Sequence, residues 1–121
     1  MLILLAHGSR DPDWRGSLET LARTVDSEMP AEDVRVAFMQ FEGPTIQEVV
    51  GGAVDSGHKT LRLLPLFMAS AGHVDKDIKP VVAGLARDHP GVDLVLLPPV
   101  GEDGLFPRLI VDIASALSGP S

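Results

Sequence analysis

Residues 2–12 read Leu-Ile-Leu-Leu-Ala-His-Gly-Ser-Arg-Asp-Pro, an unbroken apolar run followed by a polar turn. Continuous apolar runs are typical of strands that helices cover on both faces, as in a parallel sheet. Asp11-Pro12 is typical of a helix start, with the aspartate as N-cap and the proline at the first helical position. The stretch therefore predicts a strand, a turn that carries polar groups, and a helix.

The same pattern of a strand followed by a helix recurs along the chain. Further apolar runs occupy Val34 to Phe38, Thr60 to Leu66 and Val92 to Leu97, and a segment with helical spacing follows each run. The apolar helix positions are Trp14, Leu18, Leu21, Ala22 and Val25; Ile46, Val49, Val50 and Ala53; Ile78, Val81, Val82 and Leu85; and Leu105, Leu109, Ile110, Ile113 and Leu117. We predict a single three-layer α/β domain over residues 1–121, with a four-stranded parallel sheet in the flavodoxin-like order 2-1-3-4.

Proline and glycine set the expected helix boundaries. The second helix is predicted to open at Pro44 and to stop at Gly57. Pro80 lacks a backbone N–H, so the regular part of the third helix is expected to begin near it or to follow a separate turn.

Composition and charge exclude several classes of function. The 121 residues include no cysteine, which excludes thiol catalysis and thiolate metal sites. The net charge of −7 disfavours nucleic acid as a partner, because a polyanion meets a repulsive field. The apolar run at the start of the chain is too short for a membrane span or a signal peptide, so we expect a cytoplasmic protein.

Two of the four histidines are candidates for a functional site. In an open parallel sheet, ligands bind beyond the carboxyl ends of the strands, where the strand order reverses. The first strand delivers His7 to this point and the loop after the third strand delivers His73. Imidazole is both a metal ligand and a base near neutral pH. His58 and His89 lie at helix-to-strand junctions, on the opposite edge, where we expect solvated side chains.

Several site templates are missing. The sequence has no G-x-G-x-x-G, no P-loop and no H-E-x-x-H, so it does not support nucleotide-driven chemistry or a zincin site. Ser9 is adjacent to His7, but no G-x-S-x-G elbow surrounds it, which argues against a serine nucleophile.

Two segments together resemble a known family. Leu4 to Pro12, Leu-Leu-Ala-His-Gly-Ser-Arg-Asp-Pro, and Leu64 to Ile78, Leu-Pro-Leu-Phe-Met-Ala-Ser-Ala-Gly-His-Val-Asp-Lys-Asp-Ile, resemble the small sirohydrochlorin chelatases of the cobalamin and siroheme pathways. The chain departs from the family at Gln40 and Gly43, where the family usually has Glu. It also has Lys79 before Pro80, where the family tends to place the proline directly after Asp-Ile.

The resemblance implies an ATP-independent enzyme that inserts a divalent metal ion, cobalt first and nickel or iron as alternatives, into sirohydrochlorin or a related tetrapyrrole. It also implies that the active unit is a homodimer and that the reaction needs no nucleotide. His7 and His73 are assigned jointly as metal ligands and proton acceptors. The remaining substrate-binding candidates are the cations Arg10 and Lys76, an apolar wall of Leu66, Phe67 and Met68, and the neighbours of the histidines, Ser9 and Gly72.

Two other functions remain open from the residues. The first is a tetrapyrrole or metal carrier that uses the same crevice without catalysis. The second is a histidine phosphatase, because Ala-His-Gly-Ser-Arg is similar to an Arg-His-Gly phosphate site, although Ala6 stands where the arginine belongs.

Overall fold

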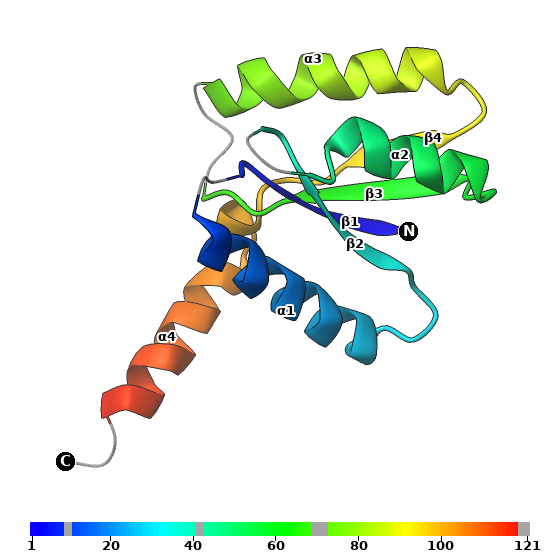
Figure 1. Ribbon diagram of the computed structural model, residues 1–121. Coiled ribbons are helices and arrows are strands. Elements are labelled where there is room, and N and C mark those ends of the chain that lie inside the picture. Colours follow the sequence, from blue (N-terminus) through cyan, green and yellow to red (C-terminus); the bar gives the residue numbers. More distant parts are fainter. Residues whose placement is uncertain (9–10, 41–42, 69–72, 119–121) are drawn as a thin grey trace.

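Four parallel strands form one sheet in a computed structural model of the chain, β1 (Leu2–Ala6), β2 (Val34–Phe38), β3 (Thr60–Pro65) and β4 (Asp93–Leu96) (Figure 1). The structure describes residues 1–8, 11–40, 43–68 and 73–118, leaving out the side chains of residues 12, 73–75 and 117–118. The strand order is β2-β1-β3-β4. The predicted fold class and strand order are therefore confirmed.

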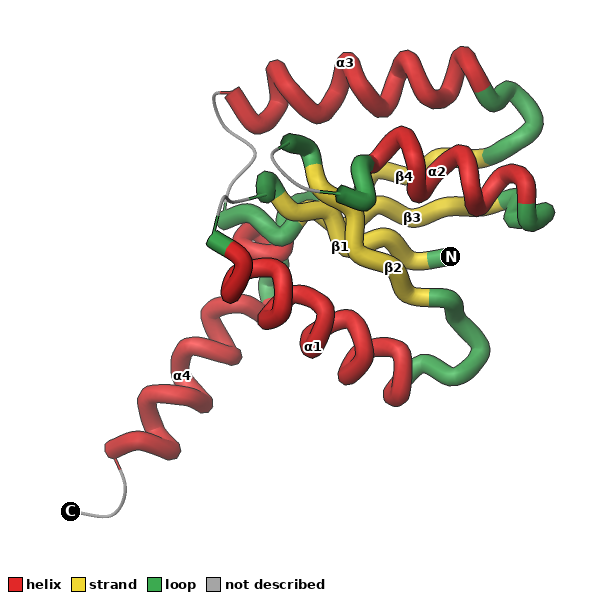
Figure 2. The backbone as a smooth tube through the Cα atoms, in the orientation of Figure 1, coloured by secondary structure: helices red, strands yellow, loops and turns green. Residues whose placement is uncertain are grey.

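The helices are divided between the two faces of the sheet. They are α1 (Pro12–Glu28), α2 (Ile46–Asp55), α3 (His73–Asp88) and α4 (Leu105–Ser118), with a short 3₁₀ turn, η1 (Val100–Glu102), before α4. Figure 2 shows α2 and α3 above the sheet and α1 below it. The fourth helix begins on the side of α1 and then projects away from the sheet.

The main core lies between the sheet and the pair α2 and α3. Its buried members are Ile3, Leu5, Ala37, Ile46, Val50, Ala53, Leu61, Leu63, Phe67, Ile78 and Leu85. A smaller core under α1 contains Leu2, Leu4, Ala22 and Val34. Odd and even positions of β1 thus contact opposite layers, which explains why its sequence is apolar throughout.

The helix starts follow local capping chemistry. Asp11 caps α1 as predicted, since its side chain accepts a hydrogen bond from the Asp13 N–H. The expected start of α2 at Pro44 is wrong by two residues. Thr45 is the N-cap, and its side-chain oxygen accepts a hydrogen bond from the Glu48 N–H, so the helix begins at Ile46.

The third helix is continuous through Pro80, contrary to the prediction that the regular helix begins near that residue. Proline removes one N–H from the helix ladder. Ile78 and Leu85 are buried against the sheet on either side of it. Burial of these flanking side chains holds both halves of α3 in one helix, so packing outweighs the lost hydrogen bond.

The fourth helix forms where it was predicted but does not pack as a core helix. Leu105, Leu109, Ile110 and Ile113 are all exposed. The apolar stripe of α4 therefore stays largely exposed in the described part of the chain. The chain passes through Pro98, Pro99 and η1 before α4 begins, and this connection directs the helix away from the sheet. Among the described helices, none is both long enough and apolar enough to cross a membrane.

Candidate functional site

His7 lies directly after β1, at the point where the strand order reverses between β1 and β3. Its half-buried ring packs on the ring of Phe67, which follows β3, with ring centroids 4.3 Å apart and an interplanar angle of 36°. Phe67 is itself buried in the main core. The His7 ring is therefore packed against a member of the main core.

Gly8 allows the end of β2 to approach His7 closely. Its φ is +97°, and a Cβ at this position would lie 1.9 Å from the Gln40 carbonyl oxygen. The Met39 and Gln40 N–H groups donate hydrogen bonds to the carbonyls of Ala6, at 2.9 Å, and His7, at 3.0 Å. A glycine is thus required here both by backbone conformation and by the lack of space.

The chain leaves β2 and returns within a few residues. The Phe38 N–H donates a hydrogen bond to the Pro44 carbonyl at 2.9 Å, and Phe38 also bridges to Thr45. The segment between these contacts is thereby fixed at both ends, and its first residues, Met39 and Gln40, lie beside His7.

A pocket of about 360 Å³ opens at this end of the sheet. Its lining residues come from the ends of β1 and β2 and from α3: His7, Met39, Gln40, Lys76, Asp77 and Val81. The pocket therefore offers an imidazole, a carboxylate, an ammonium group and an amide around one space. This set contains a base, two kinds of oxygen or nitrogen ligand for a first-row metal ion, and a cation for an acidic substrate.

The structure brings some of the predicted site residues together and separates others. Lys76 lines the pocket with His7, and Phe67 contacts the His7 ring. Leu66 instead packs against Leu18 and Phe38 under α1, so it contributes to a core on the other face.

Met68 is 64% exposed and is not among the pocket-lining residues. The predictions for Ser9, Arg10 and Gly72 fall outside the described residues. His73 is the first residue of α3, one turn before Asp77, and its side chain is not described.

Sequence reasoning missed Asp77 as a site residue and considered Gln40 only as a departure from a family pattern. A signal for Asp77 was present, because residues four apart in a helix share one face and Asp77 follows His73 at that spacing. Among the described side chains, no group of three or more His, Cys, Asp or Glu is arranged to hold a metal ion. His7 and Asp77 are the described pocket residues with suitable donor chemistry.

Gly101 in η1 packs against Phe67 and Met68, which follow β3. A Cβ on Gly101 would lie 2.2 Å from the Met68 carbonyl oxygen, and the Gly101 N–H donates a hydrogen bond to the Phe67 carbonyl at 2.9 Å. Because the Phe67 ring packs on the His7 ring, the hydrogen bond from Gly101 to Phe67 helps to hold the site in place. Nothing in the sequence pattern indicated it.

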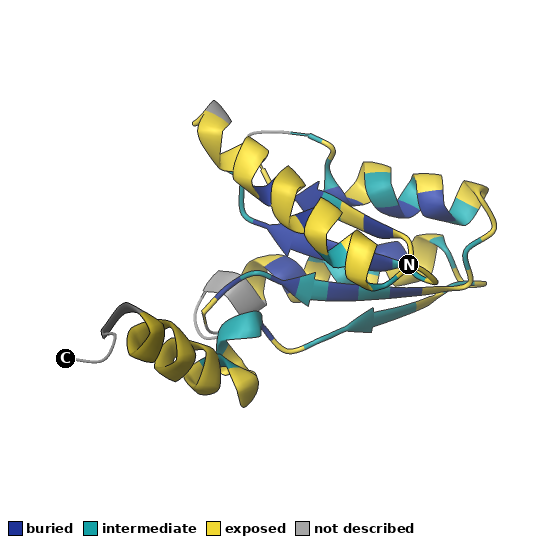
Figure 3. Cartoon of the chain, turned by 90° about the horizontal axis from the view of Figure 1, so that it is seen from below, coloured by how far each residue is buried: buried dark blue, intermediate teal, exposed yellow. Residues whose placement is uncertain are grey.

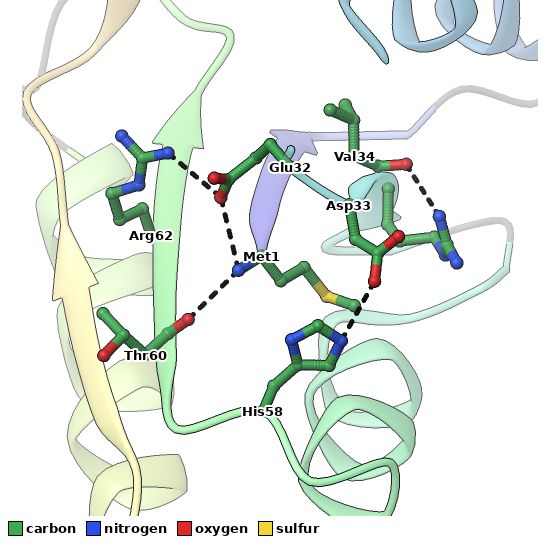
Figure 4. Close-up of polar contacts among 8 residues, drawn as sticks. Met1, Glu32, Asp33, Val34, His58, Thr60 and Arg62 are labelled. Carbon is green, nitrogen blue, oxygen red and sulfur yellow. Dashed lines mark hydrogen bonds and ion pairs between the residues drawn. The ribbon is translucent and has the colours of Figure 1, made fainter. Parts of the chain in front are cut away.

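A separate polar network lies at the opposite end of the sheet, near the amino ends of β1, β2 and β3, and is shown in Figure 4. The Glu32 carboxylate lies 3.0 Å from the Arg62 guanidinium and 3.3 Å from the amino group of Met1. Hydrogen bonds from Arg62 and from this amino group lower the pKa of the Glu32 carboxyl from its ordinary value.

His58 belongs to this edge too. Its Nε2 lies 3.1 Å from Asp33 Oδ2, and the side chain is half-buried, so the expectation of a freely solvated side chain is wrong. The short turn at Gly57 places His58 beside the loop before β2. Its position far from the pocket is as predicted.

Comparisons with known proteins agree on one family. The CbiX family model matches residues 1–116. The chain is 31% identical to a sirohydrochlorin cobaltochelatase of Methanopyrus kandleri, over 92% of each chain.

Solved structures share the fold. The crystal structure of a CbiX protein from Marinobacter aquaeolei superposes with a TM-score of 0.81 and 32% identity, covering 97% of this chain and 92% of that chain. SirB from Bacillus subtilis, solved with Fe³⁺, superposes with a TM-score of 0.82 at 19% identity, and the match covers 98% of this chain but 47% of SirB.

Proposed function

This chain belongs to the CbiX family, and on that premise we propose that it is a metal chelatase that inserts a divalent metal ion into sirohydrochlorin or a closely related tetrapyrrole. Its similarity to a cobaltochelatase along almost the whole length of both chains supports this reaction. The observation in this molecule that carries the proposal is the pocket at the carboxyl end of the sheet, which combines His7 with groups from the end of β2 and from α3.

The proposed chemistry has two parts. The metal ion must be held loosely enough to be released, and the two pyrrole N–H protons that it replaces must be accepted. Imidazole does both near neutral pH. We assign these roles jointly to His7, whose ring is fixed by Phe67, and to His73, which begins α3 one turn before a pocket residue.

Asp77 is proposed as the acidic partner of the histidines. Gln40 stands where the resembling chelatases usually carry a glutamate, and an amide cannot accept a proton at neutral pH. Asp77 lines the same pocket and restores a carboxylate there. Lys76, beside it, is proposed to attract a carboxylate of the tetrapyrrole.

Cobalt is the proposed metal, with nickel or iron as alternatives, and no nucleotide takes part. We also propose a homodimer within the cytoplasm and a single domain over residues 1–121. The dimer is supported by two observations. The chain spans about half the length of SirB, and the pocket of about 360 Å³ is small for a tetrapyrrole macrocycle. A second copy that faces the first encloses the part of the macrocycle that this pocket cannot hold.

The test is a matrix of metals against tetrapyrroles without nucleotide. Sirohydrochlorin is mixed anaerobically with Co²⁺, Ni²⁺ or Fe²⁺, and insertion is followed from the absorbance change of the macrocycle. We expect the protein to accelerate insertion over the uncatalysed mixture through many turnovers. Stoichiometric binding without acceleration points to the carrier instead, and turnover only with ATP contradicts the nucleotide-free proposal.

A further inference from the structure

The apolar stripe of α1 begins with Trp14 and continues along the sheet at helical spacing. Leu18, one turn after Trp14, is buried in a cluster with Ala6 and Phe38, the last residues of β1 and β2. Ala22, one turn later again, is buried with earlier residues of the same two strands. The stripe therefore runs from the carboxyl ends of the strands toward their amino ends as α1 proceeds.

Trp14 lies past the point where the strands end. Four helix residues advance by about 6 Å, so Trp14 is that far beyond Leu18, which already contacts the last strand residues. Long side chains in a helix lean toward its N-terminus, and this tendency directs the indole further past the strand ends. The side chain is 45% exposed. Figure 3, which views the molecule from the side of α1, shows most of this helix exposed.

The same end of the sheet carries the proposed reaction site. Ala6 faces α1, whereas His7, the next residue, packs its ring on Phe67 of the core on the other face. Figure 1 shows that α1 and α3 both start at this end. Trp14 and His7 therefore flank the end of β1 from its two sides.

We propose that the Trp14 indole stacks on the macrocycle of the tetrapyrrole while the centre of the macrocycle faces His7. The pocket at His7, about 360 Å³, is too small for a whole tetrapyrrole, so the rest of the ring system lies over the neighbouring surface. An exposed indole suits a flat conjugated ligand, because two aromatic systems attract each other in offset stacks. The inference rests on the proposed function, from which it takes its ligand.

Binding of metal-free sirohydrochlorin tests the contact without catalysis. The Kd is measured from the absorbance change of the macrocycle. We expect Trp14→Ala to raise the Kd about tenfold, the scale of one aromatic contact, and Trp14→Phe to raise it less. Leu21→Ala is the matched control and should keep the parent Kd, because Leu21 is a similarly exposed apolar residue of α1, two turns further from the strand ends.

A spectroscopic readout reports on the contact in the parent protein. Trp14 is the only tryptophan of the chain, so labelling with fluorotryptophan gives one protein signal in fluorine NMR. We expect sirohydrochlorin to move this signal upfield, because a nucleus over the face of a conjugated macrocycle lies in its ring current. A signal that stays in place while the absorbance shows saturation overturns the contact. This measurement needs no substitution, so it decides the question even where Trp14→Ala fails to fold.

The outcomes separate this inference from the proposed function. Equal Kd values for the parent and a folded Trp14→Ala protein overturn the stacking contact and leave the chelatase proposal standing. A parent protein that does not bind sirohydrochlorin overturns both. Light scattering covers the other surface that can lie on Trp14, a second copy of the chain. A dimeric parent that becomes monomeric in Trp14→Ala assigns the indole to that copy and overturns the contact with the tetrapyrrole.

Discussion

Substitution of Gly8 by alanine tests whether the close approach of β2 to His7 builds the site. Gly8 and Gly57 both have positive φ, at +97° and +92°. A Cβ on Gly8 would lie 1.9 Å from the Gln40 carbonyl oxygen, while a Cβ on Gly57 would meet nothing within 4 Å. Gly57→Ala is therefore a matched control that carries the conformational cost without the collision.

The two costs can be separated in magnitude. The left-handed backbone costs about 1–2 kcal/mol for a residue other than glycine, and we expect Gly57→Ala to lose this much. Relief of the collision in Gly8→Ala requires the Gln40 peptide to move by more than 1 Å, given a normal contact of about 3.5 Å. The two hydrogen bonds that hold Met39 and Gln40 are then lost, at about 0.5–1.5 kcal/mol each, so the total loss is about 2–5 kcal/mol.

Urea unfolding and metal insertion together measure the effect. We expect Gly8→Ala to unfold at clearly lower urea than Gly57→Ala. Its insertion rate per folded molecule should fall by about 10- to 100-fold, because a displacement of about 1 Å in a site has that scale of effect. Gly57→Ala should retain the parent rate. Equal unfolding midpoints and equal rates for the two variants would refute the reasoning.

Three further predictions concern other parts of the molecule. Gly16→Ala should raise the free energy of unfolding by about 0.5–1 kcal/mol, measured in urea, because Gly16 lies inside α1 with open space at its Cβ. The pKa of Glu32 is lowered in the folded protein, so its ion pair stabilises the fold above the ordinary carboxyl pKa, and this stability is lost as pH falls through the folded-state pKa. Arg62→Gln should therefore make the free energy of unfolding depend less steeply on pH in this acidic range. An unchanged pH dependence contradicts the pairing. Asp77→Asn should lower the insertion rate at least about tenfold in a folded protein, whereas Asp88→Asn at the far end of α3 should not, and equal rates remove Asp77 from the site.

The strand order could be predicted because it follows from general rules. Buried parallel strands have continuous apolar runs, and crossover rules leave few ways to order four of them. His7 could be placed at the pocket because it directly follows β1. The continuity of α3 through Pro80 could not be predicted, since it depends on how firmly Ile78 and Leu85 pack against the sheet.

The other residues of the site and the packing of α4 could not be predicted, because they depend on tertiary geometry. Gln40 reaches the pocket because the chain leaves β2 at Met39 and returns at Pro44, and no residue pattern specifies that path. Gly101 supports Phe67 from a distant segment for the same reason. For α4, helical spacing identifies which face is apolar but not which surface covers it.

The most direct test of the proposed chemistry is the rate of cobalt insertion into sirohydrochlorin by variants lacking one imidazole, each shown to be folded. We predict that His7→Ala and His73→Ala each lose at least about a hundredfold at neutral pH, since a general base alone contributes about 10²–10⁴-fold. The controls His58→Ala and His89→Ala, at the other edge of the sheet, should stay within about threefold of the parent, because neither side chain lines the pocket. A folded His7→Ala or His73→Ala protein that inserts cobalt at the parent rate contradicts the assignment of that histidine.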